Sequence, residues 1–223
     1  MSLEIVRLML KLIIGNKAYS SWSLRAWIAL KQVGLGFEEI LVPLDRPESA
    51  AALRAHSPSG RVPCLAHGLF RVWDSLAIIE TVAEAPIGAA LWPRDRALRA
   101  HARAIAAEMH SGFANLRRHL PMDLKRKPEP RAYPEEVAAE IARIEAIWAE
   151  CLAAKPTGGP FLFGAFSAAD AMFAPVATRL RTYAVPVSPA TREYCEAIFA
   201  HPAMQEWVAA ALKEPWVIEY PRP

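Results

Sequence analysis

Residues 17–34, KAYSSWSLRAWIALKQVG, decide the fold because they place several hydroxyls directly before a helical pattern. Apolar residues recur at helical spacing from Leu24 to Val33, and Gly34 is placed to end the helix. One serine oxygen is enough to cap a free backbone N–H at a helix start. The other hydroxyls are therefore available for chemistry at the positive end of the helix dipole. The hydroxyls belong to Tyr19, Ser20, Ser21 and Ser23.

The composition indicates a folded chain without a general attraction to nucleic acid or to an anionic membrane. Its 223 residues are 53% hydrophobic, enough for a sizeable core, and the net charge is only +3. No apolar run approaches the roughly 20 residues that span a bilayer. The first residues, MSLEIVRLMLKLIIG, mix charged with apolar side chains and lack a signal-peptide layout. We therefore expect neither nucleic acid nor a membrane among the partners.

The cysteines and histidines predict neither a disulfide framework nor a metal site. Cys64, Cys151 and Cys195 are odd in number, lie far apart and form no Cys-x-x-Cys pair. This pattern is typical of reduced thiols in a cytoplasmic protein. The six histidines show no ligand-like spacing, so we expect no metal cofactor.

Hydrophobic periodicity divides the chain into two halves of different type. Up to about residue 84, strand and helix patterns alternate, which predicts a small α/β layer. After Pro93 only helical spacing continues, which predicts an all-helical bundle. We expect an α/β domain over 1–85, a linker over 86–94 and a helical domain over 95–223. The predicted strands are 8–14, 37–44 and two short ones within 62–75; the predicted helices are 23–34, 51–57, 75–84, 94–120, 134–152, 167–180 and 191–212.

The serine cluster is a candidate site for an anion. A hydroxyl at a helix start can donate a hydrogen bond to a bound anion, and the helix dipole adds to the attraction. If the anion is a substrate thiolate, a hydrogen bond of roughly 1.5–3 kcal/mol and the dipole together lower the thiol pKa by about two units. The alternative is a plain helix cap within a polar loop.

Two further motifs suit the recognition of a peptide. In SGRVPCL, a cis peptide bond between Val62 and Pro63 would turn the backbone of Val62 outward to pair with an extended peptide. In WDSLAIIE, Ser75 at a helix start can bind a carboxylate while Asp74 pairs with an ammonium, and an α-amino acid head group offers both. A strand-edge proline and a plain helix cap are the alternatives.

In this order and spacing, the motifs resemble the cytosolic glutathione transferase family. SSWSLRAWIAL, from Ser20 on, is most similar to the SSCSWRVRIAL pattern of the zeta class (maleylacetoacetate isomerase) and its bacterial relatives. SGRVPCL is similar to that family's loop before its cis-proline, and DSLAIIE is similar to its QSLAIIEYL stretch. FLFGAFSAADAMFAPV (161–176) resembles the segment that leads into the family's central buried helix.

The resemblance implies a fold, a ligand and an assembly. The fold is a thioredoxin-like domain that binds glutathione, followed by an all-α domain that shapes the pocket for a small electrophile, usually in a homodimer. Ser20 falls on the serine that activates the thiol, with Ser21 beside it, and Ser23 is left to cap the helix. Tyr19 is a further candidate hydroxyl, ranked below the serines.

The resemblance also implies how glutathione is held. Val62 would pair by its backbone with the cysteinyl part, before cis-Pro63, and Asp74 and Ser75 would hold the γ-glutamyl head group. Two positions depart from the zeta pattern, since Trp22 replaces a cysteine and Asp74 replaces a glutamine. The missing cysteine does not remove thiol activation, but it weakens an assignment to the maleylacetoacetate reaction.

The helical half supplies further candidates for an electrophile pocket. His110 and Arg117 can face the cleft between the halves and contact an anionic co-substrate, or they are solvated surface residues. Met109 and Phe113 stand at a helical spacing that favours the core over the pocket. Farther along, the S-x-x-D sequence at Ser167 is a capping-box variant that serves folding. The candidate pocket residues are Tyr19, Trp22, Met109, His110, Phe113 and Arg117.

These motifs predict a glutathione transferase that adds the glutathione thiolate to an electrophile, or uses it to isomerise or reduce one. The resemblance also implies a role in detoxification. A non-catalytic glutathione-binding or ligand-carrier protein of the same fold is the first alternative, because it would share the binding residues. An unrelated α/β-plus-helical interaction module is the second.

Overall fold

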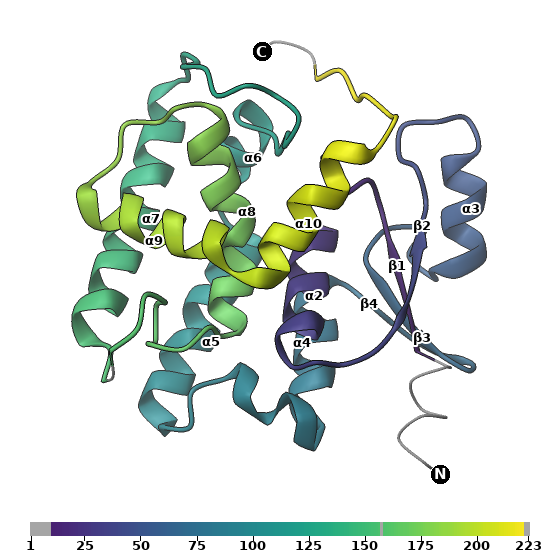
Figure 1. The fold of residues 1–223 in the computed structure, drawn as a ribbon, viewed down its shortest axis with the longest axis horizontal. Coiled ribbons are helices and arrows are strands. Elements are labelled where there is room, and N and C mark those ends of the chain that lie inside the picture. The colour runs from purple at the N-terminus through teal and green to yellow at the C-terminus, as the bar shows by residue number, and fades with distance from the viewer. Residues whose placement is uncertain (1–9, 157, 221–223) are drawn as a thin grey trace.

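The computed structural model describes residues 10–156 and 158–220, which form a small α/β layer packed against a bundle of helices (Figure 1). The strands are β1 (Leu10–Ile14), β2 (Glu38–Leu41), β3 (Cys64–His67) and β4 (Phe70–Trp73). They form one sheet in the order β2-β1-β3-β4. β1 runs parallel to β2 and antiparallel to β3, and β4 returns antiparallel to β3.

Helices cover both faces of the sheet because its strands carry apolar side chains on both sides. The three helices are α2 (Ser21–Gln32), α3 (Ser49–His56) and α4 (Ser75–Glu84). α2 and α4 lie on the face toward the bundle, and α3 covers the other face (Figure 1). Successive residues of a strand point to opposite faces, so Leu12 and Ile14 join the main core while Ile13 packs with Leu53 of α3.

The described residues from 96 onward form helices and the segments that connect them. A short 3₁₀ helix and the helices that follow it are η1 (Pro86–Leu91), α5 (Arg96–Ser111), α6 (Ala114–His119), α7 (Glu135–Ala154), α8 (Ala168–Thr182), α9 (Pro189–Ala200) and α10 (Pro202–Lys213). α8 is buried along nearly its whole length, in contact with α2, α5 and α9. It is therefore the central helix of the bundle.

The predicted combination of a thioredoxin-like α/β layer and an all-helical bundle is confirmed. The strands are shorter than predicted; β2, for example, covers 38–41 of the predicted 37–44. Residues 8 and 9 of the first predicted strand lie outside the described residues. The domain boundaries near residues 85 and 95 stay predictions.

The prediction of one long helix over 94–120 is wrong, because this stretch holds two helices. The helical stretch predicted over 191–212 also holds two. Phe113 has a φ of 56°, in the left-handed region, so the chain cannot run through it as one helix. Pro202 has no N–H and disfavours helical backbone at the residue before it, so α9 ends at Ala200, His201 caps both helices, and α10 begins at Pro202. The apolar periodicity continues across both breaks, so the spacing of apolar residues does not indicate them.

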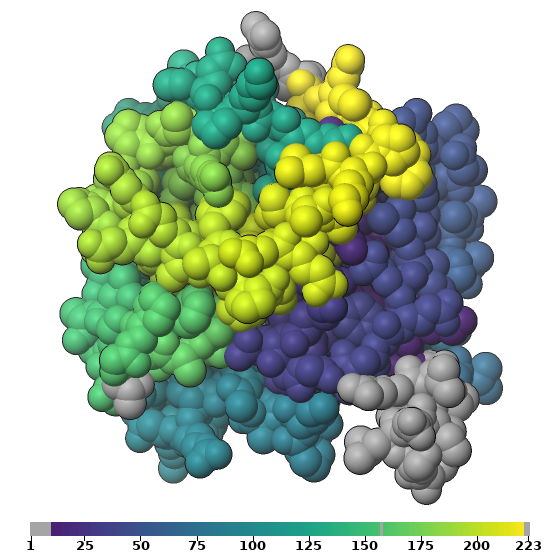
Figure 2. All heavy atoms as spheres, viewed as in Figure 1, coloured from purple at the N-terminus to yellow at the C-terminus, as the bar shows by residue number. Residues whose placement is uncertain are grey.

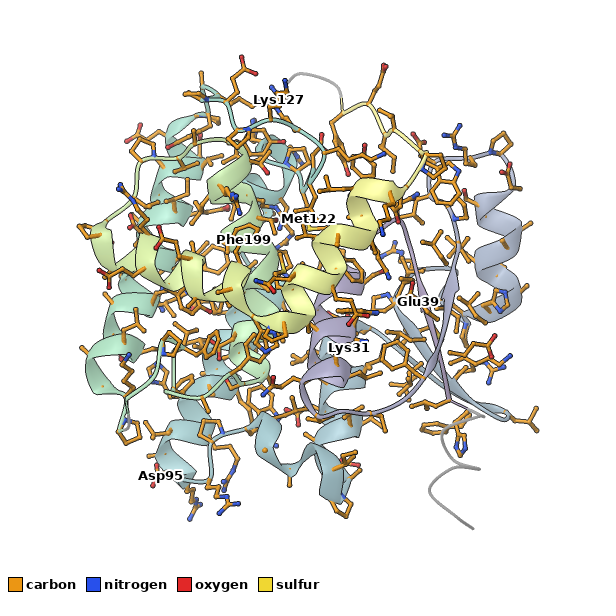
Figure 3. All side chains as sticks on the ribbon, viewed as in Figure 1. Lys31, Glu39, Asp95, Met122, Lys127 and Phe199 are labelled. Atoms are coloured by element: carbon orange, nitrogen blue, oxygen red, sulfur yellow. The ribbon has the colours of Figure 1, made fainter. Side chains whose placement is uncertain are left out.

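α2 joins the two halves of the molecule. The side chain of Arg25 is fully buried, and its Nε donates to the carbonyl oxygen of Met172 in α8 at 3.1 Å. The ring centroids of Trp27 in α2 and Trp207 in α10 lie 5.1 Å apart, and Trp207 Nε1 donates to the carbonyl oxygen of Lys17 at 2.9 Å. α10 crosses in front of α2 (Figure 2), and side chains fill the space between α2, α8 and α10 (Figure 3).

α8 begins at a buried capping network centred on Asp170. This carboxylate accepts hydrogen bonds from the N–H of Ser167 at 2.8 Å and from its hydroxyl at 2.7 Å. It also accepts from the N–H of Leu162 and the hydroxyl of Tyr194, each at 3.0 Å. Burial raises the pKa of the carboxyl in spite of these four donors. The predicted capping role of Ser167 is confirmed.

Ser167→Ala should lower the free energy of unfolding by about 0.5–2 kcal/mol, because it removes a capping side chain. Asp170→Ala should have a larger effect, because it leaves several buried donors without an acceptor, each costing roughly 1–3 kcal/mol. Urea denaturation followed by circular dichroism measures both. Ser111→Ala, at an exposed position of α5, is the control and should change the value by less than about 0.5 kcal/mol. Equal midpoints for Ser167→Ala and the control would contradict the capping role.

Candidate functional site

Residues from three of the sequence motifs meet in a cavity of about 540 Å³ between the α/β layer and α5. The predicted site residues that line it are Trp22, Val62, Pro63, Asp74, Ser75 and His110. Ser59, Arg61 and Trp73 also line it and were not predicted. Each of them lies within one of the motifs, and nothing else in the sequence indicates that it lines the cavity.

Asp74 is held in one orientation at the start of α4. It is the N-cap residue, with a φ of 77°, and its Oδ1 accepts from the N–H groups of Leu76 at 2.9 Å and Ala77 at 3.3 Å. Its Oδ2 lies 2.6 Å from Nε2 of His110 in α5. The ring of His110 also meets the ring of Trp22 edge-on, with centroids 5.2 Å apart. The carboxylate therefore links the α/β layer to the bundle at the cavity.

Ser75, the first residue of α4, carries a hydroxyl without a partner. The residue is fully buried, and its Oγ makes no hydrogen bond within the described part of the chain. A buried hydroxyl left unpaired is costly, so a ligand that brings an acceptor stabilises it. Asp74 Oδ1 takes the N–H groups of Leu76 and Ala77, which leaves the N–H of Ser75, at the first helical position, without a helical partner. The hydroxyl and the N–H of Ser75 together suit a carboxylate.

The loop before β3 forms another wall of the cavity. The Val62–Pro63 peptide bond is cis, as predicted. Gly60 has a φ of +63°, which favours glycine, and its N–H donates to the carbonyl oxygen of Ser57 at 2.9 Å. This turn brings the backbone of Val62 to the cavity.

The serine cluster forms a hydrogen-bonded chain at the start of α2. Ser20 is the N-cap residue, and its Oγ accepts from the N–H of Ser23 at 3.4 Å. The prediction that Ser23 caps the helix is wrong, because this residue is fully buried and its Oγ accepts from the N–H of Gly15, directly after β1, at 3.0 Å. The Oγ atoms of Ser20 and Ser23 lie 2.7 Å apart. Ser20 and Ser21 are buried next to Trp22 and do not themselves line the cavity.

Three other predicted pocket residues lie away from the cavity. Tyr19 packs against the ring of Tyr220, with centroids 6.0 Å apart, and burial raises its pKa. Met109 and Phe113 belong to the main hydrophobic core, the place that their spacing favoured. The structure gives these three side chains a packing role.

Trp22 covers Arg25 and Arg117, which form a cluster with Arg179. The guanidinium carbon of Arg25 lies 4.3 Å from the centroid of the Trp22 ring, and that of Arg117 in α6 lies 5.6 Å from it. Burial, followed by repulsion from Arg179 and Arg117, holds the pKa of Arg25 well below its usual value. Burial, followed by repulsion from Arg117, lowers the pKa of Arg179 in α8 to about 10. Arg117 was predicted to face the cleft, but it does not line the cavity. Arg25 and Arg179, which were not predicted as site residues, do not line it either.

The arginine cluster has more donors than acceptors. Arg25 Nε bonds the carbonyl oxygen of Met172, and Arg179 Nη1 donates to the carbonyl oxygen of Pro175 at 3.0 Å. Both Nη atoms of Arg25 and the Nε of Arg179 have no partner among the described residues. The negative charge of Asp74 acts in the opposite direction to the other arginines and raises the pKa of Arg25. Buried charges are normally paired, so these guanidiniums leave an uncompensated positive charge behind Trp22, next to the cavity that this ring lines.

The thiols of the chain do not suit a nucleophile. Burial raises the pKa of Cys64, and it raises those of Cys151 and Cys195 to about 12, so all three thiols are neutral near pH 7. Within residues 10–156 and 158–220, no group of three or more His, Cys, Asp or Glu side chains is placed to hold a metal ion. In the same residues, we find no helix with the length and apolar character needed to cross a membrane.

The fold and this site define a class of protein. Models of the N-terminal and the C-terminal domain of glutathione S-transferase match residues 19–85 and 131–210. The chain belongs to the glutathione S-transferase family, which is a family of enzymes.

Within this family, the chain is similar to zeta-class proteins. It is 35% identical over 109 residues to the probable maleylacetoacetate isomerase of Caenorhabditis elegans, a match that spans 49% of this chain and about half, 50%, of that protein. A solved maleyl pyruvate isomerase, a bacterial zeta-class protein, is 26% identical, with a TM-score of 0.71 over 93% of this chain and 100% of its own. A Burkholderia glutathione transferase homologue with bound glutathione is 28% identical, with a TM-score of 0.66 over 91% and 97% of the two chains.

Proposed function

We propose that this chain is an enzyme that activates the thiol of glutathione for addition to, or isomerisation of, a small electrophile that carries a carboxylate. The observation that supports this best lies at the start of α4. There the capping carboxylate of Asp74 and the unpartnered, buried hydroxyl of Ser75 border one cavity. The similar protein from Burkholderia holds glutathione in its solved structure.

An α-amino acid head group, as in the γ-glutamyl part of glutathione, fits these two residues. Its carboxylate would accept from the hydroxyl and the N–H of Ser75, at the positive end of α4. Its ammonium would pair with Oδ2 of Asp74, which His110 holds at 2.6 Å. The backbone of Val62 would pair with the cysteinyl part, which brings the thiol toward Trp22 at the start of α2.

The serines at the start of α2 are our candidates for thiol activation. The N–H of Gly15 donates to Ser23 Oγ. The hydroxyl of Ser20 donates to Ser23 Oγ at 2.7 Å, and rotation of this hydroxyl toward the cavity would present its proton to a thiolate instead. Ser21 is the second candidate. A hydrogen bond of this kind and the helix dipole both favour the ionised thiol, so its pKa falls.

The arginine cluster favours a co-substrate with a carboxylate. Arg25 and Arg179 have donors without acceptors, and Arg117 lies over the face of the Trp22 ring. A carboxylate near Trp22 would satisfy part of this buried positive charge. Two of the similar proteins are named as isomerases of maleylacetoacetate and maleyl pyruvate, which are both carboxylates.

The alternative of a glutathione-binding protein without turnover shares the cavity at α4. It differs in needing neither thiol activation nor a site for a second substrate, and the arginine cluster speaks against it. The wider setting that we propose, a cytoplasmic homodimer with a role in detoxification, is supported by the likeness to the family.

Ser75→Ala should weaken glutathione binding by roughly 1–3 kcal/mol, because it removes a hydrogen-bond donor from a buried carboxylate. Isothermal titration calorimetry measures this change. Thr81→Ala, farther along α4, is the matched control and should bind glutathione as the unmutated chain does. If a folded Ser75→Ala protein keeps the original dissociation constant, the head-group assignment is wrong.

Ser20→Ala should leave glutathione affinity within a few-fold and raise the pKa of the bound thiol by roughly one to two units, because the lost bond favours only the thiolate. Turnover below that pKa should fall about 10- to 100-fold. Ser21→Ala should raise the pKa of the bound thiol by less than this and lower turnover by less. Ultraviolet absorbance of the thiolate, titrated against pH, measures both variants, and a titration that neither variant shifts would rule out serine activation.

A further inference from the structure

The loop that leads from β1 to α2 is held by residues that lie far from it in the chain. It covers residues 15–19, and we refer to it as the entry loop. Within it, the carbonyl oxygen of Asn16 accepts from the N–H groups of Tyr19 at 3.1 Å and Ser20 at 2.8 Å. The position of the loop therefore sets the position of Ser20, the N-cap residue of α2.

Glu214 binds two consecutive N–H groups of the entry loop. Its Oε1 accepts from the N–H of Lys17 at 2.6 Å, and its Oε2 accepts from the N–H of Ala18 at 3.1 Å. All three residues are buried, and the exposed fraction of Glu214 is 8%. Hydrogen bonds to an ionised acceptor are stronger than neutral ones, so this single carboxylate fixes both peptide groups.

The place of Glu214 indicates that its side chain serves the loop and not its own helix. It is the C-cap residue of α10, at the negative end of the helix dipole, where an anion is unfavourable. The ammonium of Lys125 donates to the carbonyl oxygens of Glu214 and, at 3.2 Å, of Trp216, so it compensates the helix end. Among the described residues, the carboxylate forms hydrogen bonds to the N–H groups of the entry loop alone.

Other elements hold the same two residues of the entry loop. Trp207 of α10 bonds the carbonyl oxygen of Lys17 through Nε1. The carbonyl oxygen of Ala18 accepts from the N–H of Leu124 at 3.1 Å. The ammonium of Lys17 pairs with Glu39 of β2 at 2.7 Å. The backbone N–H and carbonyl groups of Lys17 and Ala18 therefore all have partners outside the loop.

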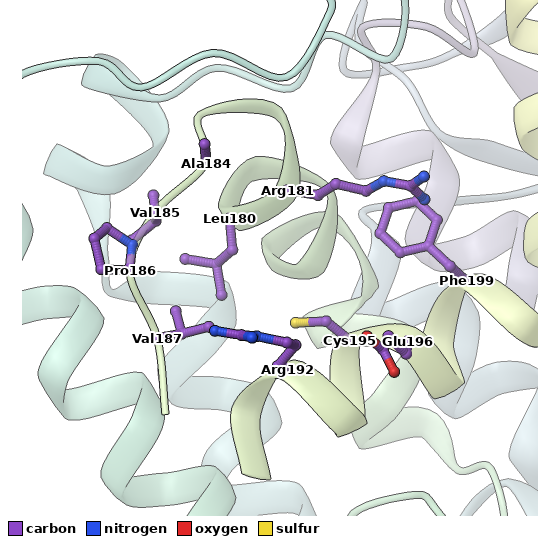
Figure 4. A pocket seen from close by; sticks show the side chains of 10 residues that line it. All are labelled: Leu180, Arg181, Ala184, Val185, Pro186, Val187, Arg192, Cys195, Glu196 and Phe199. Carbon is purple, nitrogen blue, oxygen red and sulfur yellow. The ribbon is translucent and has the colours of Figure 1, made fainter. Parts of the chain in front are cut away.

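The segment that carries Leu124 is itself tied to the end of α8. The carbonyl oxygen of Asp123 accepts from the hydroxyl of Thr182, the last residue of α8, at 3.1 Å. Ala184 then takes a left-handed φ of 44°, and the chain turns away beside a hollow of about 560 Å³ (Figure 4). The entry loop is thus held by the ends of α8 and α10, although it belongs to the α/β layer.

We propose that Glu214 is a positioning residue for thiol activation, an inference that rests on the proposed role of Ser20. Glu214 does not line the cavity at Asp74, so it acts through the backbone of the entry loop. It holds this loop where the Ser20 hydroxyl can turn toward a bound thiol. A hydrogen bond weakens steeply with distance and angle, so a shift of the loop by about 1 Å would remove most of the effect of Ser20.

Glu214→Gln should raise the pKa of the bound glutathione thiol by roughly one unit and lower turnover below that pKa about tenfold. The amide keeps one acceptor oxygen, but its NH₂ group cannot accept from the second N–H. Glutathione affinity should stay within a few-fold, because the head-group site lies at α4. Loss of a negative charge would by itself lower the thiol pKa, so the direction of the shift separates positioning from charge.

Glu214→Asp is the second variant. It keeps the charge but is one methylene shorter, so its oxygens no longer reach both N–H groups, and it should also raise the thiol pKa. Glu206→Gln, which removes a carboxylate of α10 that pairs with Lys31 at 2.7 Å, is the matched control and should change neither thiol pKa nor affinity. Thiolate absorbance titrated against pH measures the pKa, calorimetry measures the affinity, and circular dichroism checks that each variant is folded.

The double variant Ser20→Ala/Glu214→Gln separates this inference from the proposed function. If Glu214 acts through Ser20, the double variant should titrate as Ser20→Ala alone does. A titration that Ser20→Ala leaves unshifted would refute serine activation itself. A shift in Ser20→Ala without one in the folded Glu214 variants, or fully additive shifts in the double variant, would overturn the role of Glu214 alone.

Discussion

The structure depends on the burial of Arg25. This side chain carries a charge from α2 into the boundary between the two halves, where its Nε bonds Met172 of α8 and the ring of Trp22 covers it at 4.3 Å. Removal of a charge from water is costly, and one carbonyl oxygen does not balance it. The neighbouring Arg117 and Arg179 add to the same charge. The contact between α2 and α8 therefore buries positive charge next to Trp22, which lines the cavity.

Two helix starts and the arginine cluster all place positive charge near the cleft between the halves. The positive end of α4 carries the free hydroxyl of Ser75, and the positive end of α2 carries Ser20. A peptide with a carboxylate at one end and an ionised thiol in its middle matches these two helix starts. Asp74 is the negative group among them, and its bond to His110 holds it in place for the ammonium of the proposed ligand. The acidic co-substrate that we propose rests on the arginines, whose buried donors have no acceptor among the described residues.

The sequence predicts the fold class, and it singles out Asp74 and Ser75, which the structure brings to the cavity, because both follow from local patterns. Alternating strand and helix periods define the layer, and Asp74 precedes an apolar helical run as a cap does. The break at Phe113 was missed because the apolar spacing continues through it while its backbone changes. Ser23 was misassigned because its partner lies at the end of β1, outside the local motif. Arg25 and Arg179 were missed since an arginine in a helix is ordinarily exposed, and only packing against another helix buries it.

The most direct measurement of the central claim compares kcat/KM for two electrophiles, an α,β-unsaturated ketone that carries a carboxylate and the methyl ester of the same compound. The account predicts that the acid is preferred by about tenfold or more, since a charged hydrogen bond contributes roughly 1.5–3 kcal/mol. Arg117→Gln should remove most of this preference and leave turnover of the ester unchanged. Equal kcat/KM values for the two compounds, or a preference for the ester, would contradict the account.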